Sequence, residues 1–444
     1  MRHLRRLLYL WAFAAISMPT AVALEPRANV ERAVELIDAG RYALARSYLE
    51  PALIDYRLGP GERSRAYYLR GFSFFAQGMH VSASKDYNRA LEFHPRNPVV
   101  LTALAQMHLE GRGVDANPPM AVALLREAVE AADHAPAKLW LGIAYLRGLG
   151  VESSLSDARR WLESAAGDGE ARAMLHLAQS YRAPEAQQPD PDTARQWYER
   201  AREAGVSEAL VYLGYMAEAG EGGEPDPDAA RGYFAQAAEA GVPVAQAKLA
   251  HIYLTGQGVE PDPARARALF RRAAEGGHAA GYMGLAYLYE TGTGVARDEA
   301  RALDWYERAA EAGLVDAQIR MAYAGLRQGG LEGQQRARSW LAQAAARNSP
   351  QALNDYAWLL ATSRHPAVRD GQQALTLAQQ AVSRSRTPGY LDTLAAAYAE
   401  TGKFARAVAT QQAALAMVPE GEAELTRELE AHLRAFEAGE PWRE

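Results

Sequence analysis

The stretch YLTGQGVEPD, residues 253–262, decides how this chain folds. Its glycines Gly256 and Gly258 flank a single residue, as do the first two glycines of a dinucleotide-binding loop. That loop would need a third glycine at position 261, where the chain has Pro261. Paired glycines recur instead at 111 and 113, 148 and 150, 220 and 222, and 292 and 294. Because a binding site seldom needs five copies, we interpret the pair as the corner of a structural repeat.

Three further rows of residues recur with a period of about 36. The first row is small except at its first member: Leu101, Ala137, Ala173, Ala209, Ala245, Gly281, Ala317 and Ala352. The second row is alanine throughout: Ala121, Ala158, Ala194, Ala230, Ala266, Ala302 and Ala337. The third is bulky: Leu124, Trp161, Trp197, Tyr233, Leu269, Trp305 and Trp340. Apolar residues at this spacing predict two amphipathic helices per repeat, one before the glycines and one after them.

Such helical hairpins cannot bury their apolar faces alone, so they must stack on one another. Gly256 and Gly292 suit the left-handed residue that ends a first helix, and an Asp or Pro a few positions later starts the second. We expect these corner glycines to carry stability rather than activity. Replacing either with alanine is expected to cost about 1 kcal/mol.

The repeat resembles the Sel1-like repeat, whose pattern is A-x-x-x-L-G-x-x-Y-x-x-G-x-G-V followed by A-x-x-W-[FY]-x-x-A-A. Seven units match over about 99–349, best over 245–313 and least over 173–206. In that weakest unit Pro184 stands at the glycine position, so we expect an irregular corner there. The resemblance implies an all-α fold, a right-handed α/α superhelical solenoid of stacked helical hairpins.

The flanking segments resemble the related tetratricopeptide repeat. Before the array, the family's small, aromatic and proline positions are met by Gly71, Phe74, Ala83, Tyr87, Ala90 and Pro95. After it they are met by Ala395, Tyr398, Gly402, Ala407, Ala414 and Pro419, with Gln411 at the usual aromatic site. Residues 28–57 and 351–385 are predicted as looser hairpins, and 422–438 as a charged helix that caps the stack.

The first 23 residues differ from the rest of the chain. A basic start is followed by apolar residues 7–18, Pro19, and the small-x-small sequence Ala21-Val22-Ala23 that signal peptidase reads. We predict a cleaved signal peptide over 1–23 and a periplasmic or secreted mature protein, with an uncleaved anchor as the alternative. The predicted organisation is then 24–98 tetratricopeptide-like, 99–350 seven Sel1-like repeats, and 351–444 tetratricopeptide-like with the capping helix.

The composition of the chain excludes several kinds of catalytic and metal site and disfavours one class of partner. Without Arg2, Arg5 and Arg6 of the signal peptide, 45 basic residues face 54 acidic ones, a net charge of −9, which disfavours nucleic acid as a partner. No cysteine is present, which excludes thiol nucleophiles, thiolate metal sites and a lipidated N-terminal cysteine. The ten histidines form no H-x-x-x-H or H-E-x-x-H pair. We therefore predict no catalytic residue, no metal, no cofactor and, after signal removal, no transmembrane helix.

One short motif keeps an enzyme hypothesis open. Residues 82–85, SASK, match the S-x-x-K of penicillin-recognising serine enzymes, and some exported Sel1-like proteins have been linked to penicillin binding. However, no S-D-N or K-T-G accompanies it, and Ala83 is needed as the small packing residue of the repeat. We favour the structural interpretation of Ser82.

The leading functional hypothesis is a non-enzymatic scaffold that binds another protein, as the resemblance implies for families of both repeats. The alternative is an assembly scaffold of an envelope machine for exopolysaccharide secretion or peptidoglycan remodelling, as the repeat-rich alginate-secretion lipoprotein is. The identity of the partner and the oligomeric state stay open.

The expected partner surface is the concave face. In the related tetratricopeptide fold, the residue after the small one of the first helix faces the inner groove. In this chain that row includes four consecutive rings, with two carboxylates one turn further on: Tyr215, His251, Tyr287 and Tyr323, with Glu218 and Glu290. Rigid, half-polar aromatic rings suit peptide recognition, and the carboxylates would favour a basic partner. The alternative is that the rings only fill the contact between adjacent repeats.

Overall fold

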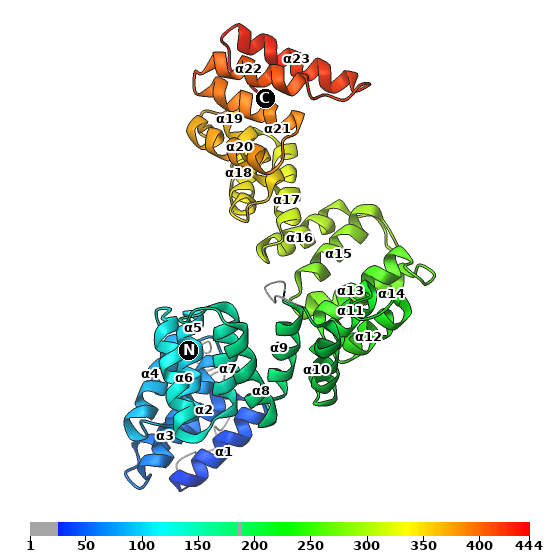
Figure 1. Ribbon diagram of the computed structural model, residues 1–444. Helices are drawn as coiled ribbons and strands as arrows, with labels where there is room; N and C mark the ends of the chain where they lie inside the picture. Colours follow the sequence, from blue (N-terminus) through cyan, green and yellow to red (C-terminus); the bar gives the residue numbers. More distant parts are fainter. Residues whose placement is uncertain (1–24, 184–188) are drawn as a thin grey trace, which may run out of the picture. The chain divides into compact units, whose positions relative to one another are not determined.

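The computed structural model describes residues 25–183 and 189–444 (Figure 1). The predicted signal peptide and Pro184 lie outside these residues. Over the described ranges the regular secondary structure is entirely α-helical. None of the described helices combines the length and the hydrophobicity that crossing a bilayer would need.

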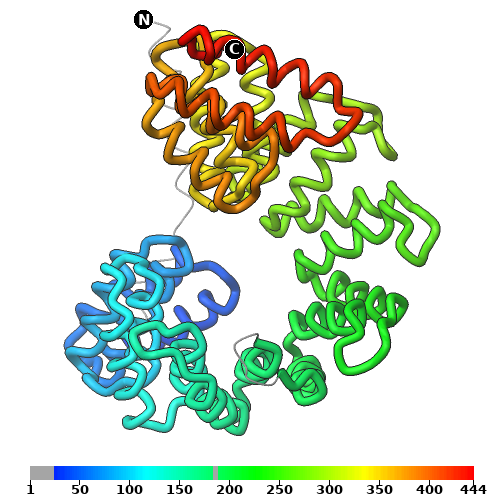
Figure 2. The backbone as a smooth tube through the Cα atoms, turned by 45° about the horizontal axis from the view of Figure 1, so that its top comes forward, coloured from blue at the N-terminus to red at the C-terminus, as the bar shows by residue number. Residues whose placement is uncertain are grey.

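The chain divides into two compact units, one ending at Pro225 and the other starting at Asp226. The helices of the first unit are α1 (Pro26–Asp38), α2 (Tyr42–Ile54), α3 (Pro60–Phe75), α4 (His80–Phe93), α5 (Pro98–Glu110), α6 (Pro118–Ala132), α7 (Ala135–Arg147), α8 (Leu155–Gly167), α9 (Ala171–Arg182), α10 (Pro191–Glu203) and α11 (Glu208–Ala219). Within this unit consecutive helices pack as antiparallel hairpins, and each hairpin stacks on the next (Figure 2).

The second unit repeats this arrangement. Its helices are α12 (Pro227–Glu239), α13 (Pro243–Thr255), α14 (Pro263–Glu275), α15 (Ala279–Thr291), α16 (Glu299–Glu311), α17 (Val315–Gln328), α18 (Gly330–Ala345), α19 (Pro350–Thr362), α20 (Gly371–Arg384), α21 (Pro388–Glu400), α22 (Phe404–Leu415) and α23 (Ala423–Glu437). The prediction of stacked helical hairpins is confirmed within each unit.

The glycine corner has the predicted geometry. Gly256 ends α13 with φ +72° and Gly292 ends α15 with φ +77°, a left-handed conformation that L side chains rarely adopt. The next helix starts at an aspartate: the side chain of Asp262 accepts the backbone N–H of Arg265. The backbone N–H of Asp262 in turn donates to the carbonyl of Tyr253 at 2.8 Å, which fastens the two helices of the hairpin together.

The small rows form the hairpin interfaces. Ala137, Ala245 and Ala317 of the first row have no exposed surface, nor has Ala266 of the second. The bulky row is only half-buried at its tryptophans, whereas the residue after each member is buried: Leu125, Leu162, Tyr198, Phe234, Phe270, Tyr306 and Leu341. The space between the helices is therefore filled mainly by the residue that follows each member of the bulky row.

The N-terminal flank packs as its tetratricopeptide-like pattern predicts. Ala83, Tyr87 and Ala90 of α4 are buried. A side chain at Gly71 of α3 would bring its Cβ within 2.7 Å of the Tyr87 ring, so this position must be glycine for the two helices to approach.

Candidate partner-binding surface

The six residues predicted for the partner surface fall in both units. Tyr215 and Glu218 lie on α11 in the first unit, where Tyr215 is half-buried and Glu218 is exposed. The remaining four lie in the second unit: His251 on α13, Tyr287 and Glu290 on α15, and Tyr323 on α17. The geometry that follows concerns this second set.

The three rings of the second unit are presented to solvent by the helices that carry them. Tyr287 and Tyr323 keep 43% and 41% of their surface exposed, and His251 is also exposed. The residue before each ring is an alanine without exposed surface, namely Ala250, Ala286 and Ala322. One helical position thus anchors each helix in the core, and the next exposes a ring to solvent.

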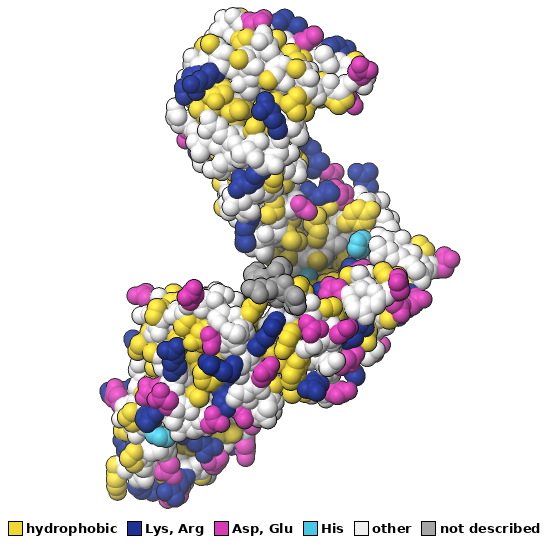
Figure 3. All heavy atoms as spheres, in the orientation of Figure 1, with side chains coloured by type: hydrophobic (Ala, Val, Ile, Leu, Met, Phe, Trp, Pro, Cys, Tyr) yellow, Lys and Arg dark blue, Asp and Glu magenta, His cyan; other side chains and the backbone are white. Residues whose placement is uncertain are grey.

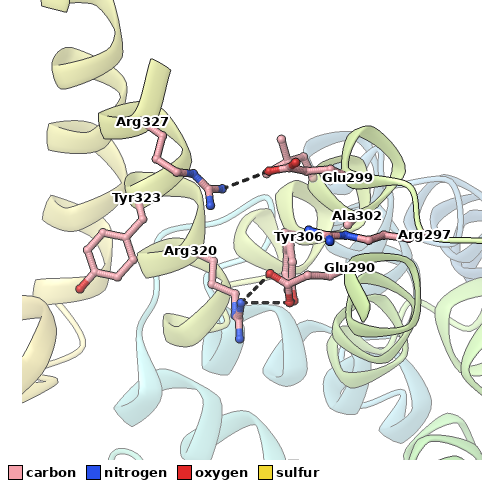
Figure 4. Close-up of a pocket in the computed structure, with 9 residues that line it drawn as sticks. Glu290, Arg297, Glu299, Ala302, Tyr306, Arg320, Tyr323 and Arg327 are labelled. Carbon is pink, nitrogen blue, oxygen red and sulfur yellow. Dashed lines mark hydrogen bonds and ion pairs between the residues drawn. The ribbon is translucent and has the colours of Figure 1, made fainter. Parts of the chain in front are cut away.

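Glu290 has a role that the sequence did not show. Its carboxylate accepts a hydrogen bond from the Tyr306 hydroxyl at 2.7 Å and pairs with the Arg320 guanidinium at 3.0 Å. These contacts join α15, α16 and α17 (Figure 4). The charge of Glu290 is thus already paired within the protein, and its contribution to binding a basic partner stays a prediction.

A small hollow of about 150 Å³ lies beside this ion pair. Arg327 on its rim is 3.7 Å from the carboxylate of Glu299, and Figure 4 shows both side chains reaching toward each other across the hollow. Tyr323 projects from α17 on the side away from Glu290 (Figure 4). The ring thus reaches from the edge of this hollow toward the next hairpin.

The Tyr323 hydroxyl donates to the carboxylate of Asp355 on α19 at 2.6 Å. Burial raises the pKa of Tyr323 to about 12, and the hydrogen bond to Asp355 adds to this effect. Burial also raises the pKa of Asp355, although hydrogen bonds from Tyr323 and Asn354 oppose the shift. Asp355 was not among the predicted site residues, because nothing in the sequence pattern pairs α17 with a carboxylate on α19.

We expect Asp355→Asn to raise the melting temperature at neutral pH. Because folding raises the pKa of Asp355, the folded state binds a proton more readily than the unfolded state. The resulting loss of stability is present above the pKa that Asp355 has in the folded protein. It disappears as pH falls from that pKa to the lower pKa of the unfolded chain. Asparagine carries no such penalty and still accepts the Tyr323 hydroxyl. Thermal melts of both proteins across this acidic range measure the difference, which should shrink as pH falls; a constant difference would contradict the assignment.

Ser82 of the S-x-x-K motif is half-buried on α4. Ala83 beside it is fully buried, and the hydroxyl of Ser84 donates to the carbonyls of Val81 and Gly113 at 3.0 and 3.2 Å. Asp86 is tied to Arg70 by an ion pair of 2.7 Å.

Over residues 25–183 and 189–444, no group of three or more His, Asp or Glu side chains could hold a metal ion. On the face shown in Figure 3, acidic and basic side chains of the first unit are interspersed.

The family model of the Sel1 repeat matches seven consecutive segments: 98–133, 135–169, 171–206, 207–242, 243–278, 279–314 and 315–349. Together they span more than half of the chain. The chain belongs to the Sel1 repeat family. The predicted number of seven units is confirmed, and the match includes the weak unit around residue 184. No curated protein matched the sequence.

Solved structures with similar folds include other repeat proteins. A protective antigen of uropathogenic Escherichia coli strains matches with a TM-score of 0.50 and 24% identity, over 94% of this chain and 91% of the antigen. A Sel1 repeat protein of Oxalobacter formigenes matches with a TM-score of 0.47 and 28% identity, over 55% of this chain and 98% of that protein. Yeast Tom70 matches with a TM-score of 0.37 and 14% identity, over 93% and 96% of the two chains. The similarity to the antigen shows the fold of this Sel1 repeat protein.

Proposed function

We propose that this Sel1 repeat protein is a non-enzymatic, periplasmic or secreted scaffold that binds another protein through the exposed rings of the second unit. Solenoids of Sel1 and tetratricopeptide type are typical protein-interaction folds. The observation that carries the proposal is the row formed by His251, Tyr287 and Tyr323. Each ring is exposed at the same position of its repeat, directly after a buried alanine.

Exposed aromatic side chains of this kind are costly to leave in water and are enriched at the centres of protein interfaces. A ring that only filled the contact between neighbouring repeats would have little accessible surface. Tyr287 and Tyr323 each keep about two fifths of theirs, so part of each side chain is accessible to a partner.

We expect Tyr287→Ala to weaken capture of the partner by about 1 kcal/mol or more, while the melting curve stays nearly unchanged. Tyr287 is the better test than Tyr323, because truncating Tyr323 would also remove the hydrogen bond to Asp355. The experiment is a pull-down from an envelope extract with the tagged mature protein, followed by titration of the recovered partner. Tyr56→Ala is the matched control, since Tyr56 is 87% exposed but belongs to the first unit and not to the row. Equal binding by Tyr287→Ala and the parent protein, or a lower melting temperature with unchanged binding, would refute the role of the row.

The periplasmic or secreted location has its own test. We expect exported protein to begin near Leu24 and to remain in the supernatant after the membranes are pelleted, because residues 1–23 have the order of a cleaved signal peptide. N-terminal sequencing together with fractionation measures this. A chain that starts at Met1 and sediments with the membranes would establish an uncleaved anchor.

A further inference from the structure

A cavity of about 490 Å³ opens between α17, α18, α19, α21 and α23 in the second unit. Four carboxylate side chains and two aromatic rings contribute to its wall: Asp355, Asp392, Glu428, Glu444, Tyr323 and Trp358. The described residues that line it include no lysine, arginine or histidine. The cavity therefore combines negative charge with flat aromatic surface, and it begins at Tyr323, the last ring of the proposed binding row.

Two of these carboxylates, Asp392 and Asp355, differ in the groups that donate hydrogen bonds to them. Asp392 accepts hydrogen bonds from Gln411 at 2.7 Å and from the His432 ring at 2.8 Å, so it is held by the core. Asp355 receives its hydrogen bonds from neutral groups, the Tyr323 hydroxyl at 2.6 Å and the Asn354 amide at 3.4 Å. Burial raises the pKa of Asp355, as expected for a carboxylate taken out of water without a cation beside it. An incoming cation would relieve this penalty.

The last five residues, 440–444, lie against the surface beside this cavity. Residues 440–444 follow α23 without helical structure, and the backbone of Glu444 exchanges hydrogen bonds with Thr362 and Arg364, at 2.8 and 3.3 Å. The guanidinium of Arg443 pairs with Glu400 at 2.5 Å, and Glu444 accepts the indole N–H of Trp358 at 3.0 Å. An extended segment that carries an arginine thus already lies against the C-terminal end of α19, next to the cavity.

We propose that the cavity receives an arginine side chain from an extended segment of the protein partner. The inference rests on the proposed function and names the chemistry of the partner. A guanidinium is planar, so it can stack on the ring of Trp358 or Tyr323 while it donates two hydrogen bonds to Asp355. Charge complementarity favours this occupant, because the lining offers carboxylates and rings but no competing cation.

The test uses the full mature chain labelled with 5-fluorotryptophan, with the resonance of Trp358 assigned through Trp358→Phe. The probe is a capped five-residue peptide with one central arginine among alanines, and its matched control carries citrulline, which has the same shape without the charge. We expect the arginine peptide to shift the Trp358 resonance at millimolar concentration and the citrulline peptide to leave it in place. Asp355→Asn should weaken binding of the arginine peptide by about tenfold, because an ion pair between two charged groups becomes a hydrogen bond from the charged guanidinium to a neutral amide.

Two further variants test whether peptide binding depends on the cavity or on general electrostatic attraction to the protein. Glu444→Gln removes a charge from the rim on an exposed side chain and should weaken binding less than Asp355→Asn. Glu311→Gln removes an exposed charge on α16, outside the cavity lining, and should leave binding unchanged. Equal shifts with both peptides, no shift with either, or equal losses in Asp355→Asn and Glu311→Gln would each overturn the proposal. If Tyr287→Ala abolishes partner capture while the arginine peptide leaves Trp358 unmoved, the proposed function stands and this inference fails.

Discussion

Gly150→Ala is expected to destabilise the contact between the first two Sel1 repeats by several kcal/mol. Gly150 is the second glycine of its corner, and its φ is +72°. A Cβ at this position would lie 2.3 Å from the carbonyl carbon of Pro118 and 2.4 Å from its oxygen, at the start of α6 in the preceding repeat. The left-handed conformation costs alanine about 1–2 kcal/mol, and forcing apart two packed backbones adds about 1–3 kcal/mol.

The measurement is urea unfolding of the full chain combined with hydrogen exchange, since stability in a repeat array is lost locally. Protection should fall most in α6, α7 and α8. Gly148→Ala in the same corner is the matched control: Gly148 has φ +65°, but the nearest atom to an added Cβ is 3.6 Å away. This control should lose only about 1–2 kcal/mol, the conformational cost alone. Equal losses in the two variants would mean that the approach of the repeats does not require the second glycine.

The contrast between these two glycines shows where sequence reasoning reaches its limit. The first glycine of a corner ends a helix, which is a local property, and the apolar row before it together with the charged turn after it predicts its left-handed conformation. At Gly113, Gly150 and Gly294 the second glycine is needed because the preceding hairpin approaches it. At Gly113 the neighbour is the backbone of His80, and at Gly294 it is Pro263. A pattern along one chain marks such a position but does not tell which atoms lie opposite it.

The candidate site was likewise predictable from the sequence only in part. The rings at 251, 287 and 323 share one position of the repeat, so their period and the resemblance were enough to select them. The hydrogen bond of Tyr323 to Asp355 was not predictable, since Asp355 lies in the next hairpin and outside the row. The cavity depends on contacts between residues far apart in the chain, such as Trp358 with Glu444. No periodicity indicates that the end of the chain returns to α19.

Gln411 was noted as a departure from the tetratricopeptide pattern, which has an aromatic residue at this site, and the structure explains it. The side chain is fully buried on α22. Its amide donates to the Asp392 carboxylate on α21 at 2.7 Å and to the Leu429 carbonyl on α23 at 3.0 Å. His432 also lies 2.8 Å from Asp392. A buried polar network thus joins the last three helices where the family would use an aromatic ring.

We therefore expect Gln411→Leu to destabilise α21–α23, although leucine is apolar, similar in volume and a good helix former. The substitution removes a donor from Asp392, which is only 6% exposed, and a buried carboxylate that loses a hydrogen bond costs about 2–4 kcal/mol. Hydrogen exchange of the full chain should show lower protection in these three helices and unchanged protection in α13–α16. Gln412→Leu is the matched control, because Gln412 is exposed on the same helix and should change stability by less than about 0.5 kcal/mol. If both variants exchange like the parent protein, packing alone holds the capping helix, and the network formed by Asp392, Gln411 and His432 contributes nothing to it.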